Sequence, residues 1–302
     1  MRNITDLSLV IGATGLQGGA SARHLLALGR PVRFLTRNVQ SRASRALTQA
    51  GAQAQPGDLD DAISLAAAMA GTKSVFSVQL PDLKGDDSER RQGDALVRAA
   101  LAAGVTQVIH TSVAQTGHHQ SFPGWESGRW WNKYWTDKFY VEQAVRNAGF
   151  DFWTILQPAF MMDNFVEPRA HIMFPALAKG QLVTALLPET RLDFIAANDV
   201  GVFAAAAVAE PKRFHSLTIP LAAQSITMIE VATILSSSWK SAIKAVYVSS
   251  AVALARGLLP GWVNSQEWMN EVGYQVNIDQ LKSFGLPLMT LQSWATDHRG
   301  TS

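Results

Sequence analysis

Residues 7–19 read LSLVIGATGLQGG, and this stretch decides the fold. The apolar run 7–11 predicts a buried strand, and the alanine- and leucine-rich stretch 18–28 predicts a helix. Gly12 permits a tight turn between them, Gly15 lets backbone N–H groups approach a phosphate, and Gly18 lets the helix pack close to the strand. This order predicts a Rossmann unit whose helix N-terminus binds the pyrophosphate of a dinucleotide, although a glycine turn without a ligand is the alternative.

Size and composition exclude several classes of function. The chain has 302 residues, a net charge of +2 and no cysteine, so disulfides, thiolate catalysis and cysteine metal sites are ruled out. No basic block suggests nucleic-acid binding, and no apolar run reaches the ~18 residues that a membrane span needs. Because the N-terminus enters the first predicted strand almost directly, we expect no signal peptide and a cytoplasmic location.

Strands and helices alternate through the first half of the chain. This order predicts an α/β fold with a doubly wound parallel Rossmann sheet, followed by a smaller mixed C-terminal substrate lobe. We expect the dinucleotide-binding Rossmann domain to cover residues 1–157 with a returning segment at about 190–215, where Asp199 is a plausible helix N-cap. An interleaved substrate-binding lobe is expected over residues 158–302. The predicted strands are 7–11, 31–36, 52–56, 74–78, 105–111 and 152–156, and the main predicted helices are 18–28, 60–69, 89–103 and 134–148.

Two charged residues follow the second and third predicted strands. Arg37 stands where an acidic residue would bind the 2′-hydroxyl of NAD, and its guanidinium can instead pair with a 2′-phosphate. This favours NADP(H) over NAD(H), against the alternative of an ordinary surface arginine. Asp58 follows the third strand, where it could accept a hydrogen bond from the adenine amino group or could cap the next helix.

Tyr134 and Lys138 form a Tyr-x-x-x-Lys pair on the helix after the fifth predicted strand. A spacing of four residues places both side chains on one face of a helix. In short-chain dehydrogenases the lysine binds the nicotinamide ribose and lowers the pKa of the tyrosine, which exchanges the proton that accompanies hydride transfer. Ser112, at the end of the fifth strand, is expected to orient the substrate oxygen. The alternative is that Tyr134 only packs.

The loop before this helix is rich in aromatic residues, among them Trp130 and Trp131. Such a cluster would suit a flat apolar substrate, but a hydrophobic plug that holds down a long loop is an equal alternative. His118 and His119 are adjacent and have no accompanying carboxylate motif, so no metal site is expected.

Together these motifs, with the run 153–164 (WTILQPAFMMDN) and the run 194–201 (FIAANDVG), resemble the NmrA-like family of atypical short-chain dehydrogenases/reductases. The likeness covers most of the chain. Members of that family include NADPH-dependent quinone, dye and phenylpropanoid reductases, and also NADP(H)-binding regulators. The resemblance implies that Gln17, Leu59, Gln79, Phe160 and Asn164 line the cofactor. The full set of expected NADP(H) contacts is Gly12, Thr14, Gly15, Leu16, Gln17, Gly18, Arg37, Asp58, Leu59, Gln79, Lys138, Phe160 and Asn164.

We therefore expect an NADPH-dependent reductase that transfers hydride to a small apolar carbonyl, quinone or conjugated acceptor. Tyr134, Lys138 and Ser112 are the expected catalytic residues, and Trp130, Trp131 and Phe160 the expected substrate pocket. The alternative is an NADP(H)-binding redox sensor with little or no catalysis; sugar-nucleotide epimerase chemistry is disfavoured by Arg37. We expect a small-molecule substrate as the partner, with no binding to nucleic acid or membrane. The chain is expected to be a monomer or a homodimer.

Overall fold

The computed structural model describes residues 6–299, and the contacts within it divide the chain into two compact units. The first unit comprises Met1–Thr116, Lys133–Gln157 and Ala197–Ile219. The second comprises Gly117–Asn132, Pro158–Ala196 and Pro220–Ser302. The two units therefore alternate along the sequence. The expected assignment of a substrate-binding role to a lobe at 158–302 stays a prediction.

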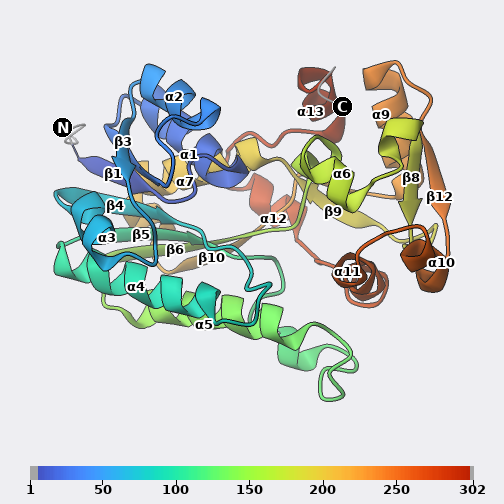
Figure 1. Cartoon of the computed structure of the whole chain (residues 1–302), viewed down its shortest axis with the longest axis horizontal. Coiled ribbons are helices and arrows are strands. Elements are labelled where there is room, and N and C mark those ends of the chain that lie inside the picture. The colour runs from blue at the N-terminus through green and yellow to red at the C-terminus, as the bar shows by residue number, and fades with distance from the viewer. Residues whose placement is uncertain (1–5, 300–302) are drawn as a thin grey trace. The chain divides into compact units, whose positions relative to one another are not determined.

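The first unit is built on a seven-stranded sheet in the order β10-β6-β5-β4-β1-β2-β3. Figure 1 labels all of these strands except β2. From β1 the chain moves outward through β2 and β3, then returns to the other side of β1 and continues through β4, β5 and β6. The order in which the chain adds strands thus reverses between β1 and β4. Open parallel sheets bind ligands at such a switch point, at the carboxyl ends of their strands. The strands are β1 Leu7–Val10, β2 Val32–Thr36, β3 Gln53–Pro56, β4 Thr72–Ser77, β5 Gln107–Thr111, β6 Phe152–Pro158 and β10 Leu217–Leu221.

Helices cover both faces of this sheet, which confirms the predicted doubly wound α/β fold (Figure 1). α3, α4 and α5 lie on one face, where a core of aliphatic side chains such as Leu65, Leu96 and Val145 packs on β1, β4 and β5. α1 and α7 pack together on the other face. The helices are α1 Leu16–Ala27, α2 Arg42–Gln49, α3 Ala62–Met69, α4 Ser88–Ala102, α5 Asn132–Asn147, α7 Ala197–Ala209 and α8 Pro211–Phe214.

Glycines let two pairs of helices approach closely. A Cβ on Gly201 of α7 would lie 2.6 Å from the backbone carbon of Ala20 in α1, so only glycine fits this contact. A Cβ on Gly93 of α4 would lie 2.7 Å from a methyl group of Val141 in α5.

The returning segment corrects one expectation, because α7 begins at Ala197 and Asp199 lies in its first turn rather than at its N-cap.

The second unit contains two small sheets and short helices around a core rich in phenylalanine and tryptophan. One sheet has the order β11-β9-β7, and the other pairs β12 with β8 in parallel. The strands are β7 Phe160–Met161, β8 Gln181–Thr184, β9 Leu192–Ile195, β11 Gln224–Ile226 and β12 Lys244–Tyr247. The helices are α6 Arg169–Met173, α9 Met228–Trp239, α10 Ser250–Ala255, α11 Pro260–Glu271, α12 Ile278–Lys282 and α13 Leu291–Asp297, with 3-10 turns η1 His119–Ser121, η2 Met162–Phe165 and η3 Leu177–Lys179.

Candidate cofactor and active site

The glycine turn after β1 has the geometry that the sequence predicts. Gly12 has a positive φ of 66°, and a Cβ there would lie 2.7 Å from Val78. A Cβ on Gly18 would lie 2.4 Å from the carbonyl oxygen of Gly12, so the helix approaches the strand too closely for any other residue. α1 begins after Gly15 with no side-chain cap, and Gly12, Thr14 and Gly15 are exposed. The uncapped helix start keeps backbone N–H groups available for a phosphate.

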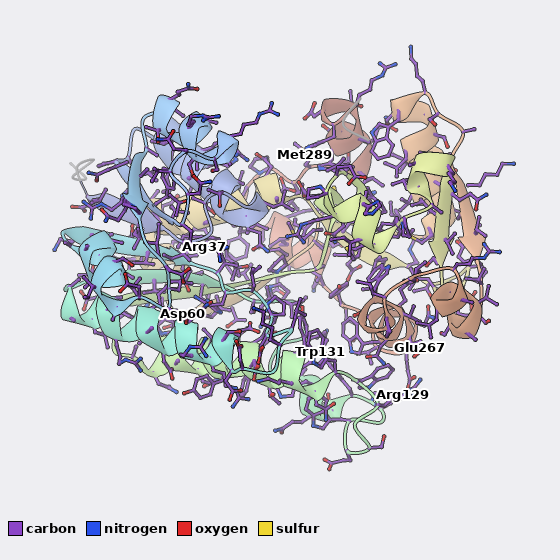
Figure 2. The ribbon with its side chains drawn as sticks, viewed as in Figure 1. Arg37, Asp60, Arg129, Trp131, Glu267 and Met289 are labelled. Atoms are coloured by element: carbon purple, nitrogen blue, oxygen red, sulfur yellow. The ribbon has the colours of Figure 1, made fainter. Side chains whose placement is uncertain are left out.

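Arg37, labelled in Figure 2, lies directly after β2, as expected. Its side chain is 81% exposed. Its Nε lies 3.8 Å from Oδ2 of Asp58, which follows the neighbouring strand β3. An exposed ion pair at this distance contributes little stability, so the guanidinium keeps its capacity to bind a phosphate. Asp58 accepts a hydrogen bond from the Asp60 amide, whereas Asp61 caps α3; the capping alternative for Asp58 is therefore wrong.

Two amide side chains at the same edge of the sheet are held by hydroxyl groups. Thr111 at the end of β5 donates a hydrogen bond of 2.7 Å to Oε1 of Gln17, which ties the start of α1 to β5. Gln79, which follows β4, is 4% exposed and donates from Nε2 to Ser77 Oγ. Its buried Oε1 has no hydrogen-bond partner among residues 6–299. Gln17 and Gln79 thus lie at the switch point, as a role in cofactor binding requires.

Tyr134 and Lys138 share one face of α5, and Lys138 Nζ lies 4.9 Å from the centre of the Tyr134 ring. Lys138 is 6% exposed and forms an ion pair of 2.9 Å with Glu89, which is 3% exposed in the first turn of α4. Burial raises the pKa of Tyr134, because it outweighs the opposite effect of the Lys138 charge. The Lys138 charge thus lowers the pKa of the phenol as expected, but burial and the Glu89 charge outweigh it, so the net shift is upward. Burial alone would lower the pKa of Lys138, but its negative partners raise it.

Ser112 is engaged with a buried carboxylate. Its hydroxyl donates a short hydrogen bond of 2.5 Å to Oε1 of Glu142, which also accepts from Gln157 at 2.8 Å. Glu142 lies one turn after Lys138 on α5, is fully buried, and pairs through Oε2 with Arg146. Because a hydroxyl has one proton to donate, Ser112 could orient a substrate oxygen only by exchanging its bond to Glu142.

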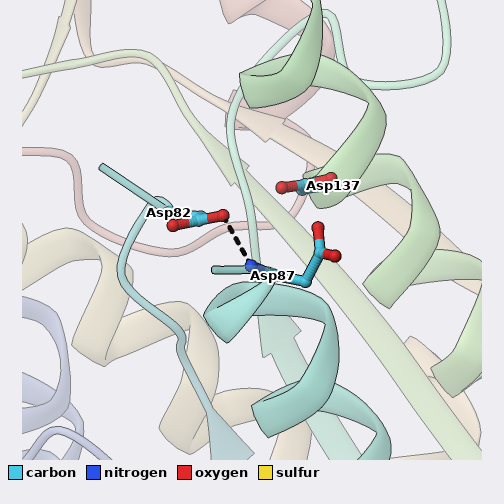
Figure 3. Close-up of side chains that lie close together, drawn as sticks. All are labelled: Asp82, Asp87 and Asp137. Carbon is cyan, nitrogen blue, oxygen red and sulfur yellow. Dashed lines mark hydrogen bonds between the residues drawn. The ribbon is translucent and has the colours of Figure 1, made fainter. Parts of the chain in front are cut away.

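Three carboxylates between α4 and α5 surround the ammonium group of Lys133. Asp82, Asp87 and Asp137 lie close together (Figure 3), and Lys133 Nζ lies 3.2, 2.6 and 2.8 Å from their oxygens. The Asp82 carboxylate also accepts hydrogen bonds from the backbone amides of residues 84–87. These amides and the Lys133 ammonium hold the pKa of Asp82 below its usual range against the effect of burial. Lys133 thus supplies positive charge to this acidic cluster together with Arg90, whose Nε lies 2.5 Å from Asp137 Oδ1.

The aromatic loop before α5 belongs to the second unit. Trp130 is 3% exposed, donates from its indole to the carbonyl of Pro123, and lies under the guanidinium of Arg129. Arg129 pairs with Glu271 of α11, whereas Trp131 is exposed. Figure 2 labels Arg129 and Trp131. The loop is therefore fastened within its own unit by Trp130, and Trp131 is the tryptophan of the two that remains accessible. A substrate pocket at this loop stays a prediction.

Phe160 and Asn164 also belong to the second unit. Phe160 stacks on Trp262 with ring centres 5.5 Å apart, and it contacts Phe194 edge to face. Asn164 is 6% exposed and its Oδ1 accepts a hydrogen bond of 3.5 Å from Arg169. Their proposed contact with the cofactor stays a prediction.

Sequence reasoning missed the acidic residues that surround the Tyr-x-x-x-Lys pair. Glu142 follows Lys138 by four residues, so the helical period alone could have placed it on the same face. Glu89 gave no such signal, because an acidic residue in the first turn of a helix is usually a solvated one that favours the helix dipole. Its burial depends on the packing of α4 against α5, which the sequence of either helix does not show.

Comparison with known proteins agrees with this architecture. The model of the NmrA-like family matches residues 5–286. An NAD(P)H azoreductase of Xenophilus azovorans is 29% identical over 254 residues, which is 84% of this chain and 80% of that protein. The NmrA-like family domain-containing oxidoreductase FrzB of Cladobotryum sp. is 32% identical over 186 residues; the match covers 57% of this chain and about half (51%) of FrzB.

Among solved structures, the negative transcriptional regulator NmrA in complex with NADP has a TM-score of 0.77 at 17% identity. That comparison covers 98% of this chain and 95% of the regulator, and it shows a shared fold. Within residues 6–299, no helix has both the length and the apolar character that crossing a membrane would require.

Proposed function

Because the chain belongs to the NmrA-like family, we propose that it is an NADPH-dependent reductase of a small, flat, apolar acceptor. The acceptor classes are a quinone, a carbonyl or a conjugated carbon, and the azoreductase relative adds azo compounds to those worth testing. When bound, NADPH would supply the hydride. The chain's own residues have to bind and orient the two reactants and provide a proton.

The observation that carries this proposal is the pairing of the glycine turn with Arg37 at one edge of the sheet. A Cβ at Gly12, Gly15 or Gly18 would meet neighbouring atoms at 3.3 Å or less, so the backbone here is shaped as a cradle. Such a cradle with an uncapped helix start fits a pyrophosphate, and the exposed guanidinium after β2 fits a 2′-phosphate. The residues present therefore fit NADP(H).

Three side chains would divide the remaining work. Lys138 would hold the nicotinamide ribose, and Tyr134 would donate the proton that the reduced acceptor needs. The tyrosine carries its proton at neutral pH, as donation in the direction of reduction requires, and the nearby Lys138 charge favours release of that proton against the effect of burial. Ser112 would help to orient the acceptor oxygen after releasing Glu142. Trp130, Trp131 and Phe160 stay the predicted contacts of the acceptor.

Replacing Arg37 with alanine tests the choice of cofactor. Hydrogen bonds to charged groups contribute about 1.5–3 kcal/mol, so we expect the Kd for NADPH to rise roughly ten- to hundredfold. The Kd for NADH should stay within about twofold, because NADH has no 2′-phosphate. Titration calorimetry measures both.

Arg98→Ala is the matched control, because Arg98 is an exposed arginine on α4 of the same unit and its loss changes the net charge equally. This variant should bind NADPH as the wild type does. An equal loss of NADPH and NADH affinity in Arg37→Ala would contradict the proposed contact with a 2′-phosphate.

A further inference from the structure

The buried ion pair between Lys138 and Glu89 is more than a structural contact. Both residues are at least 94% buried, and their Nζ–Oε1 distance is 2.9 Å. α4 and α5 follow β4 and β5, so the first turns of both helices lie at the carboxyl edge of the sheet, where the glycine turn also lies. Glu89 lies in the first turn of α4 and Lys138 in the second turn of α5, so the pair lies toward this edge of the sheet.

Both members of the pair have hydrogen-bonding capacity left over. An ammonium group has three N–H donors, and in the described part of the chain Lys138 Nζ makes one hydrogen bond, to Glu89. The second carboxylate oxygen of Glu89, Oε2, is buried and makes no hydrogen bond of standard geometry within residues 6–299, although the Asp82 amide lies near enough to the carboxylate to lower its pKa. Buried charged groups are normally saturated with partners, because an unsatisfied one is costly. The unused N–H donors of Lys138 beside the unused acceptor of Glu89 point to a ligand that both accepts and donates hydrogen bonds.

A hydroxyl group has this property, since it accepts through its lone pairs and donates its proton. A vicinal diol offers two such groups on adjacent carbons, so one can accept from Lys138 while the other donates to Glu89. We propose that Glu89 is a positioning and binding residue: it orients the Lys138 ammonium through Oε1 and accepts a ribose hydroxyl of the cofactor through Oε2. This inference rests on the proposed function, and it adds Glu89 to the expected site.

The surroundings of the pair support an orienting role. Lys138 also faces the Tyr134 ring at 4.9 Å, so its position decides where a ribose and the phenol can meet. Burial raises the pKa of Glu89 while the Lys138 charge lowers it, so the ion pair favours the charged carboxylate, which accepts hydrogen bonds through both oxygens.

Glu89→Gln tests the inference, because the amide keeps the shape of the carboxylate but turns one acceptor into a donor. The two probes are NADPH and adenosine 2′,5′-bisphosphate, which carries the 2′-phosphate of NADP but lacks the nicotinamide ribose. We expect the Kd of the full-length variant for NADPH to rise at least tenfold. The Kd for adenosine 2′,5′-bisphosphate should stay within twofold of the wild-type value, whereas Arg37→Ala should weaken both.

Two further variants separate binding from folding. Glu126→Gln makes the same chemical change at an exposed position and should leave both affinities unchanged. The double variant Glu89→Gln/Lys138→Met removes both buried charges, so it should fold even if Glu89→Gln alone is unstable. It should melt within a few degrees of the wild type and still show the selective loss of NADPH affinity.

The outcomes are distinct. If the wild type binds NADPH and Glu89→Gln binds it equally well, or loses both probes equally, Glu89 does not bind the ribose and the inference is overturned. If the wild type binds neither probe, the proposed function itself fails and the inference falls with it. A loss confined to NADPH in both the single and the double variant supports the diol site.

Discussion

His110 makes the stability of the first unit depend on pH in a way that can be calculated. It lies in β5, is 3% exposed, and its Nδ1 is 3.2 Å from Ser77 Oγ on β4. Burial, together with the positive charges of Lys138 and Arg146, lowers its pKa to about 3. The folded protein therefore keeps this imidazole neutral, whereas in the unfolded chain it titrates near its usual pKa of about 6.5.

The sign of the effect follows from proton binding. Between pH 6.5 and pH 3 the unfolded chain binds a proton that the folded chain does not, so acidification favours unfolding. Between pH 7 and pH 5 this linkage removes about 2 kcal/mol of the free energy of unfolding. The figure depends mainly on the unfolded pKa, because the folded pKa lies well below pH 5.

His110→Asn removes the titration and keeps an amide that can hydrogen-bond to Ser77. Urea unfolding at pH 7, 6 and 5 should show that the wild type loses about 2 kcal/mol more than the variant over this range. His171→Asn, at an exposed position, is the control and should change with pH as the wild type does. Parallel pH dependences of the wild type and His110→Asn would refute the reasoning.

Two other variants test the site and the Lys133 cluster. Tyr134→Phe should lower kcat by roughly 10²–10⁴-fold and leave the Kd for NADPH nearly unchanged, because it removes a proton donor but not a cofactor contact; an unchanged kcat in steady-state assays would exclude the tyrosine from proton transfer. Asp82→Asn should lower the Tm by several degrees, because the NH₂ group of the asparagine would face backbone N–H groups that now donate hydrogen bonds to the carboxylate. The depressed pKa of Asp82 gives a contribution that is present above pH 4 and lost as the pH falls, so the Tm difference from wild type in scanning calorimetry should shrink on acidification; a constant difference would contradict this account.

The first half of the chain could be predicted closely because its elements are determined locally. Buried parallel strands read as continuous apolar runs, so the strand expected at 7–11 is observed as Leu7–Val10. The helix expected at 89–103 is observed as Ser88–Ala102. The same local logic explains Gly12 and Gly18, whose need for glycine follows from a turn and a close contact within twenty residues.

What could not be predicted depends on partners that are distant in the sequence. β8 and β12 are short strands separated by some sixty residues, and their parallel pairing has no local signal. Glu89 has the sequence context of a solvated helix start, and only the packing of α4 on α5 buries it against Lys138. The pKa of Tyr134 likewise reflects burial, which the Tyr-x-x-x-Lys spacing does not encode.

The central claim is that this chain passes hydride from NADPH to a small apolar acceptor. The most direct measurement follows NADPH oxidation at 340 nm with quinones, enones, aromatic aldehydes, azo compounds and cationic dyes, alongside calorimetric NADPH binding. We predict turnover with at least one acceptor, and its loss in Lys138→Ala. Tight NADPH binding without turnover on any acceptor would contradict the claim and favour a cofactor-sensing role instead.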